Sequence, residues 1–394
     1  MVKFAKNMLG KYALLLVLLF MMLVFEILLP SGVSLFSPHN LNNLIVQNSY
    51  VVILAIGMML CIVAGGHIDL AVGSIVVLVG AFAGIFIVEW GISPYLAILM
   101  CLGIGILIGS WQAFWIAFVG IPSFIVTLAG MLTFRGIALI LMGARNIGPF
   151  PVEYRNIFNS FLPAHWLSDP TSDTVFLSTL AIGVIISILI MVVKVISYLN
   201  RKRKGYDVEN LVTEMLYPAI ICAAIIFLFH QLGQHNGMPA VLLLIGIIFM
   251  VYSYFTQNTI WGRYLYAMGG NAKAARLSGI NTKRTLFLAY ANNGFLASVA
   301  ALVVVARFNQ ASTQAGMGFE LDAIAACFIG GASAYGGTGK VSGVVIGAVF
   351  MGVLNMGMSL LGADMNLQRV INGLVLLAAV TFDIVSKKRR GSVA

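Results

Sequence analysis

The sequence predicts an all-α polytopic membrane protein with about 10–12 transmembrane helices. Only 9% of its 394 residues are charged and 60% are hydrophobic, whereas about a quarter of the residues in a soluble domain are charged. The apolar residues form continuous runs near twenty residues long, which is the length that an α-helix needs to cross a bilayer. Transmembrane β-strands would instead alternate apolar and polar residues. The composition therefore excludes a soluble enzyme and disfavours a barrel.

Twelve apolar runs define the candidate spans. In chain order they cover residues 12–29, 44–64, 70–90, 94–119, 123–143, 175–198, 211–232, 240–256, 285–306, 320–337, 341–361 and 367–385. The first run follows three lysines and ends at Pro30 without a small-residue cleavage site. We therefore predict an uncleaved first span rather than a signal peptide.

The basic residues predict the orientation. Most of the 23 Lys and Arg residues fall in segments that share one side of the membrane if the amino terminus is cytoplasmic. These segments are 1–11, 194–210, 257–284, 338–340 and 386–394. An excess of Lys and Arg in cytoplasmic loops is the usual signature of this orientation. We therefore predict that both termini are cytoplasmic, and we attribute the net charge of +10 to loop placement rather than to nucleic-acid binding.

Glycine-rich breaks interrupt the apolar pattern in two places. Their glycines are Gly65, Gly66, Gly73, Gly330, Gly331, Gly336 and Gly337. On the predicted topology, two four-span units at 44–143 and 285–385 are inverted relative to each other. Inverted repeats with broken helices are typical of transporters, because they supply two interconvertible faces around one pathway. We predict one transmembrane domain over residues 1–394 that contains both units.

The predicted cytoplasmic loop 257–284 contains a short helix candidate. Asn271 suits an N-cap, the next six residues favour helix, and Gly279 suits a C-terminal cap. Such a helix is marginal by itself in water, so it should pack against something. Docking on a partner protein and a plain interfacial loop are both open interpretations. The whole stretch is Asn271, Ala272, Lys273, Ala274, Ala275, Arg276, Leu277, Ser278, Gly279 and Ile280.

Asp69 is the most informative ionisable residue near a predicted span. It precedes the third run, where a carboxylate can satisfy the exposed N–H groups of a helix start. An acid beside a bilayer is also often functional. A structural cap and a direct role in gating or substrate passage therefore both stay open. Glu320 and Asp322 lie at the predicted outer start of the tenth run, either as a solvated rim or facing a partner.

Three motifs, in order along the chain, resemble the permease subunits of ATP-binding-cassette importers of monosaccharides, of the ribose, xylose, arabinose and galactose type. They are the stretch 262–280, the glycine-rich segment 327–343 and the segment 68–74. The xylose-type and multiple-sugar permeases look closest, because 175–232 resembles a hairpin inserted beyond the ten spans of simpler members. His67 stands where the family usually has glycine, and Ala71 where it often has serine.

The resemblance implies a permease that carries a monosaccharide across a bacterial plasma (inner) membrane and catalyses no covalent chemistry. Residues 271–280 would form the coupling helix that docks on a separate cytoplasmic ATPase subunit. A homodimer in the lipid bilayer and a periplasmic or extracellular sugar-binding protein are implied as well. Polar candidates for the sugar pathway lie near broken helices. They are Asn48, Gln112, Asn292, Asn293, Asn309 and Asn355, together with Tyr50, Trp111 and Thr127.

We predict no cofactor, no metal site and no catalytic residue. The segment that ends at Gly339 and Lys340 resembles a phosphate loop, but Ala334 and Val341 occupy two positions that the motif requires to be Gly and Ser or Thr. The alternative function is an ion-coupled secondary sugar transporter, which would need more buried acids than Asp69. An integral-membrane enzyme would need a cluster of acids, histidines or metal ligands at one membrane face.

Overall fold

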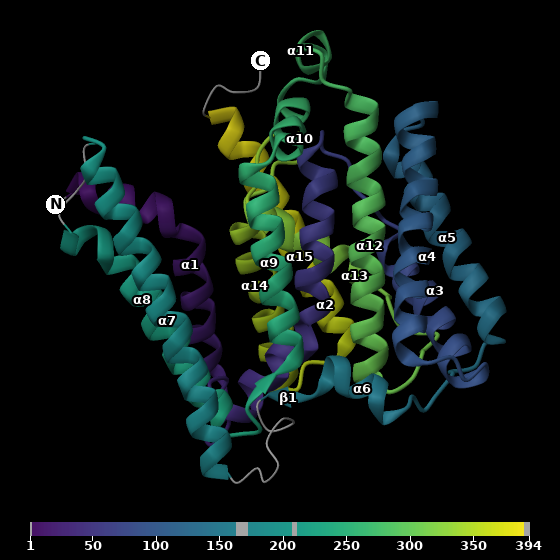
Figure 1. Ribbon diagram of the computed structural model, residues 1–394, viewed down its shortest axis with the longest axis horizontal. Coiled ribbons are helices and arrows are strands. Elements are labelled where there is room, and N and C mark those ends of the chain that lie inside the picture. The colour runs from purple at the N-terminus through teal and green to yellow at the C-terminus, as the bar shows by residue number, and fades with distance from the viewer. Residues whose placement is uncertain (1, 163–171, 207–210, 390–394) are drawn as a thin grey trace.

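The computed structural model describes residues 2–162, 172–206 and 211–389, and these are almost entirely helical (Figure 1). Within these residues, ten helical segments are long and apolar enough to cross a membrane. The segment Leu14–Leu28 is a shorter apolar helix. The prediction of an all-α polytopic membrane protein is confirmed.

The first half of the chain contains α1 (Val2–Leu28), α2 (Pro38–Val63), α3 (Val72–Gly84), α4 (Pro94–Phe114), α5 (Ser123–Met142), α6 (Val152–Asn159), α7 (Ser172–Arg203) and α8 (Leu211–Gly233). Two π-helical turns, η1 (Ile85–Glu89) and η2 (Trp115–Val119), extend α3 and α4. The short strand β1 (Phe161–Leu162) pairs antiparallel with β2 (Met238–Pro239). The second half contains α9 (Ala240–Asn258), α10 (Ile260–Gly270), α11 (Ala272–Leu277), α12 (Thr282–Phe308), α13 (Phe319–Ile329), α14 (Val341–Leu360) and α15 (Met365–Arg389).

Helices α2, α3 and α12 form the buried centre of the bundle. Most of the membrane-spanning part of each is buried, whereas α5, α7, α8 and α9 are largely exposed on the bundle's surface. Helix α12 packs closely on α4, where Gly105 and Gly109 face Gly294. Small residues let two backbones approach inside lipid, where the hydrophobic effect no longer drives helix association. These glycines therefore set the distance between α4 and α12.

The predicted helical span at 320–337 is wrong in its second half. Helix α13 ends at Ile329 after 11 residues, about 16 Å of helix, and the chain continues as a turn to Lys340. Gly331, Gly336 and Gly337 have φ values of +83°, +87° and +73°. These left-handed conformations suit glycine and end a helix. A similar non-helical segment, 64–71, precedes α3.

Helices α7 and α8 cover the range 175–232, where two membrane spans were predicted. The two helices lie side by side at the edge of the bundle that is farthest from α5 (Figure 1). Gly183 of α7 packs against Phe229 of α8. Arg201, near the end of α7, and Glu214, near the start of α8, form an ion pair. The hairpin contacts the central helix α2 through α8.

We expect Gly109→Ala to destabilise the protein. A Cβ atom there would lie 2.5 Å from the Tyr290 carbonyl oxygen and 3.0 Å from the Gly294 Cα, both of which are backbone atoms. Overpacking of this kind costs about 1–3 kcal/mol. Gly103→Ala on the same helix is the matched control, because its Cβ would meet nothing within 4 Å. Thermal unfolding in detergent should separate the two variants, and equal melting temperatures would contradict this account of the α4–α12 contact.

Candidate functional site

Asp69 lies at the centre of a buried polar network that joins three helices. Its side chain is fully buried, and one carboxylate oxygen accepts a hydrogen bond from Asn293 Nδ2 of α12 at 2.7 Å. The other oxygen accepts from the Ala71 N–H at 2.9 Å and from Gln112 Nε2 of α4 at 3.4 Å. A buried carboxylate is costly unless such donors surround it. The network therefore ties the start of α3 to both α4 and α12.

This geometry bears on the two roles that were open for Asp69. The carboxylate accepts the Ala71 N–H two residues along the chain, immediately before α3 begins at Val72, and no side chain caps the first turn of α3 itself. It also brings together Asp69, Gln112 and Asn293, three of the residues predicted to lie near the pathway. Thr127 of α5 donates at 3.5 Å to the carbonyl of Ile68. The site thus has the contacts of a structural anchor shared by four membrane helices.

A second polar cluster lies around Asp322 at the start of α13. Tyr50 of α2 donates to one Asp322 oxygen at 3.2 Å, and the Asn372 amide of α15 lies 3.5 Å from the other. Asn372 also donates to Asn355 of α14 at 2.9 Å. Asp322 is only 9% exposed, so the expectation of a solvated or partner-facing rim residue is wrong for it. Asn372 was not predicted as a site residue, although an amide side chain within an apolar run could have indicated one.

The remaining predicted pathway amides do not join either cluster. Asn48 donates to the Leu44 carbonyl of its own helix and packs against Gly352. Asn309 accepts the Phe150 N–H at 3.0 Å and holds the segment that precedes α6. Asn292 pairs with the Tyr252 hydroxyl instead. The structure therefore gives these three residues local packing contacts and does not gather them into one site.

Backbone contacts between glycines connect the two predicted breaks. A Cβ atom on Gly336 would lie 2.7 Å from the Gly65 Cα, and one on Gly66 would collide with the Ala334 carbonyl. The Gly337 N–H donates to the Val63 carbonyl at 2.9 Å. The two glycine-rich segments, far apart in sequence, thus lie directly against each other.

A third segment joins this contact from α10. A Cβ atom on Gly269 would collide with the Val63 carbonyl, and one on Gly337 would lie 2.8 Å from the Gly270 nitrogen. We call the meeting point of Gly65, Gly66, Gly269, Gly336 and Gly337 the glycine junction. Gly269 was not among the predicted break glycines, because it lies within a helix rather than between two apolar runs.

Two of the other break glycines also make close backbone contacts. Gly73 packs against Gly316, in the turn that precedes α13. Gly330 packs against Gly343 and Val344 at the start of α14. A Cβ atom on Gly331 would instead meet nothing within 4 Å, so only its left-handed φ of +83° favours glycine at this position.

The Tyr266 side chain connects α10 to the second glycine-rich segment, which follows α13. Its hydroxyl donates to the Gly339 carbonyl at 2.7 Å. Burial raises the pKa of Tyr266, so the hydroxyl stays protonated and keeps its donor. Helix α11 follows α10 after one residue, so it is joined to the glycine junction by a short connection.

The predicted coupling stretch is helical at Ala272–Leu277, as expected, whereas the helix α10 at Ile260–Gly270 was not predicted within the loop 257–284. Asn271 caps α11 by accepting the Ala274 N–H at 3.0 Å, and Gly279 adopts a left-handed φ of +84° just beyond it, as predicted. Helix α11 projects from one end of the bundle (Figure 1). Ala275 is 5% exposed and faces inward, whereas Leu277 is 90% exposed. One face of this short helix is therefore anchored and the other is free.

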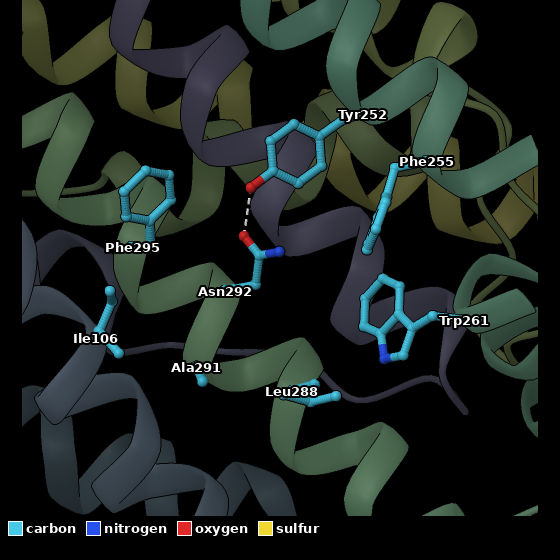
Figure 2. Close-up of a pocket in the computed structure, with 8 residues that line it drawn as sticks. All are labelled: Ile106, Tyr252, Phe255, Trp261, Leu288, Ala291, Asn292 and Phe295. Carbon is cyan, nitrogen blue, oxygen red and sulfur yellow. Dashed lines mark hydrogen bonds between the residues drawn. The ribbon is translucent and has the colours of Figure 1, made fainter. Parts of the chain in front are cut away.

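A groove of about 500 Å³ lies between α4, α9, α10 and α12 (Figure 2). Aromatic side chains dominate its walls, among them Tyr252, Phe255, Trp261 and Phe295. Asn292 from the predicted pathway set contributes its amide, which is bonded to Tyr252. The groove is thus an apolar feature separate from the Asp69 network.

Comparison with known proteins identifies close relatives along nearly the whole chain. Residues 40–380 match the family described as branched-chain amino acid transport system, permease component. The xylose transport system permease protein XylH of Haemophilus influenzae is 36% identical over 357 residues, which cover 90% of this chain and 91% of the relative. The Escherichia coli XylH is 37% identical over 360 residues, covering 90% and 86%. The ribose import permease protein RbsC of Escherichia coli is 32% identical over 350 residues, covering 89% and 87%. No solved structure matches the chain.

We expect Asp69→Ala to lower the stability of the solubilised protein strongly. The change leaves the Asn293 amide and the Ala71 N–H buried without an acceptor. Each orphaned group costs about 1–3 kcal/mol. Glu89→Ala is the control, because Glu89 forms only an exposed ion pair with Arg145, and such pairs contribute at most about 1 kcal/mol. A stable Asp69→Ala protein that has lost transport would instead favour a direct role in the pathway.

Proposed function

The chain belongs to the permease family that it matches, and from this premise we propose that it is the membrane-spanning subunit of an ATP-driven importer of a monosaccharide in a bacterial plasma membrane. The relatives that it matches over nine-tenths of its length are named as xylose transport permeases, which favours a pentose of the xylose type as its substrate. In this proposal, hydrolysis of ATP takes place in a separate cytoplasmic subunit.

The observation that carries the proposal is the free face of α11. Leu277 exposes 90% of its surface on a helix that projects beyond the bundle, and both Lys273 and Arg276 are exposed beside it. An apolar side chain in such a position is suited to a groove on another protein. The two cations would set the orientation of docking on an acidic rim more than its affinity. The partner is the ATPase subunit, which this helix would couple to the bundle.

Transmission from α11 to the pathway runs through the glycine junction. Close-packed backbones do not deform gradually, so a push on α11 would move α10 against both glycine-rich segments together. The first of these segments leads to Asp69 and the start of α3, and the second connects α13 to α14. The ATP-bound and empty ATPase would thus favour different arrangements of the helices around one pathway.

Orientation and the remaining partners follow from the same assignment. Helix α15 ends at the same end of the bundle from which α11 projects, and α1 begins there (Figure 1). This agreement supports cytoplasmic termini, as the distribution of basic residues predicts.

A sugar-binding protein would deliver substrate at the opposite end. One chain supplies one coupling helix, so two chains would serve a pair of ATPase subunits. An ion-coupled carrier is not favoured, because the chain matches a family of transport-system permease components and relatives that are named as such, although Asp322 does supply a second buried acid.

We expect Leu277→Glu to abolish co-purification of the ATPase. A carboxylate at the centre of an apolar contact would be desolvated without a partner, which weakens binding at least about tenfold. Leu361→Glu is the matched control, because Leu361 is also an exposed leucine and lies at the far end of α14. Affinity purification of the tagged permease with its neighbouring cytosolic proteins provides the measurement. Retention of the ATPase by the Leu277→Glu protein would refute the coupling assignment.

We expect Gly269→Ala to uncouple the importer without releasing the ATPase. Its methyl group would meet the Val63 carbonyl and the Gly337 backbone, so the glycine junction must open. Gly270→Ala is the control at the next position, where a Cβ would meet nothing within 4 Å. Sugar uptake should fall about tenfold or more in Gly269→Ala and stay near the wild-type rate in Gly270→Ala. Equal uptake by both variants would show that the junction does not transmit motion.

A further inference from the structure

The α5 span carries a single charged residue, Arg135, far from both of its ends. Arg135 lies about 18 Å along the helix from Ser123 and about 10 Å from Met142. Leu132 and Leu139 share its helix face and are exposed, and Arg135 itself is only partly buried. A cation in such a position is costly against lipid, so charged residues within spans usually face the bundle or water. This face of α5 therefore calls for a polar neighbour.

The nearest acid, Glu320, lies in the first turn of α13, and this turn is deep in the bundle. Asp322, two residues further on, accepts a hydrogen bond from Tyr50, which lies about 18 Å along α2 from its start at Pro38. Glu320 is partly buried, and the backbone N–H groups of Gly318 and of Glu320 itself interact with its carboxylate. The carboxylate is thus held at the start of a short helix that begins far from the membrane surface.

The start of α3 brings Arg135 and Glu320 together. A Cβ atom on Gly73 would collide with the Glu320 carboxylate, and one on Gly130 of α5 would lie 3.5 Å from the Ala71 Cβ. The two charged groups interact electrostatically, but they do not form a direct ion pair. Within the described residues, Arg135 makes no hydrogen bond either. A donor-rich cation and an acceptor thus lie near each other without being joined.

We propose that Arg135 and Glu320 form the site at which the permease contacts its sugar during passage, and this assignment rests on the proposed function. A guanidinium supplies only donors and a carboxylate only acceptors, whereas sugar hydroxyls do both. Hydrogen bonds to charged groups are the stronger ones, so two such groups hold a small polyol effectively. The two charges cancel, so the site suits an uncharged ligand rather than an anion or a cation.

The site also lies where motion from the cytoplasmic end would reach it. Gly73, which packs against Glu320 and Gly316, follows the segment 64–71 that ends the glycine junction on one side. A shift of this segment would move the start of α3 against the first turn of α13. The separation of Glu320 from Arg135 would then differ between the two arrangements of the bundle, and so would the hold on the sugar.

Access of water to the site is tested by labelling single cysteines with a charged maleimide, which reacts with thiolates in water but not in lipid. The purified permease in lipid nanodiscs is used, and its four native cysteines are buried. Arg135→Cys and Glu320→Cys should both be labelled, whereas Leu189→Cys, at an exposed position in the middle of the α7 span, should not. A folded variant that remains unlabelled at position 135 or 320 would overturn the proposal.

Contact with the sugar is tested by uptake of xylose through the assembled importer in cells. Arg135→Ala and Glu320→Ala should each lower the maximal rate about tenfold or more, as expected for a lost hydrogen bond to a charged group. The half-saturating xylose concentration should not change, because the sugar-binding protein sets it. The double variant should be no slower than either single variant, since each change breaks the same site. Arg145→Ala, which removes an exposed ion pair with Glu89, is the control.

Unchanged uptake in either alanine variant would overturn the assignment. A lower rate that comes with a lower melting temperature or with loss of the ATPase would also overturn it, in favour of a structural role for the pair. Arg135→Lys should recover part of the rate, because it keeps the charge and some donors. If the wild-type chain transported no sugar, the proposed function itself would fail, whereas the labelling would still decide whether water reaches the two charged residues.

Discussion

Backbone polar groups inside a bilayer must be hydrogen-bonded within the protein, and this requirement governs the structure around its broken helices. Helices α2 and α13 end at Val63 and Ile329, and the glycine-rich segments beyond them fold against each other. The Gly337 N–H therefore donates to the Val63 carbonyl, which brings the two glycine-rich segments into contact. Only glycine permits this approach, because a side chain at Gly66, Gly269 or Gly336 would collide with a neighbouring backbone. The same contact that satisfies the broken helices thus also couples them.

Asp69 solves the corresponding problem for the start of α3. The Asp69 carboxylate accepts the N–H of Ala71, the residue before α3, while two amides from α4 and α12 donate to it and offset its charge. The anchor and the glycine junction lie at the two ends of one short segment, residues 64–71. A movement of α10 against this segment would therefore reach the helices that meet at Asp69.

The six residues of helix α11 contact the bundle on one face and are exposed on the other. Ala275 faces the bundle and Leu277 faces away, so the helix is held by its own chain while its other side remains available to a partner. Replacing Ala275 would disturb the anchor itself, whereas replacing Leu277 changes only the free face.

The sequence by itself determined the features that depend on neighbouring residues. Hydrophobic run length predicted the spans, local propensity predicted the caps of α11 at Asn271 and Gly279, and glycine content predicted both breaks. Tertiary structure decided the contacts between distant segments. Asn293 is 224 residues from Asp69, and no local pattern announces that the two are bonded. Burial of Asp322 was likewise invisible, because an apolar run does not show which neighbour accepts its polar groups. A membrane span depends on the residues of one segment, whereas a hydrogen bond between distant residues depends on how the whole bundle packs.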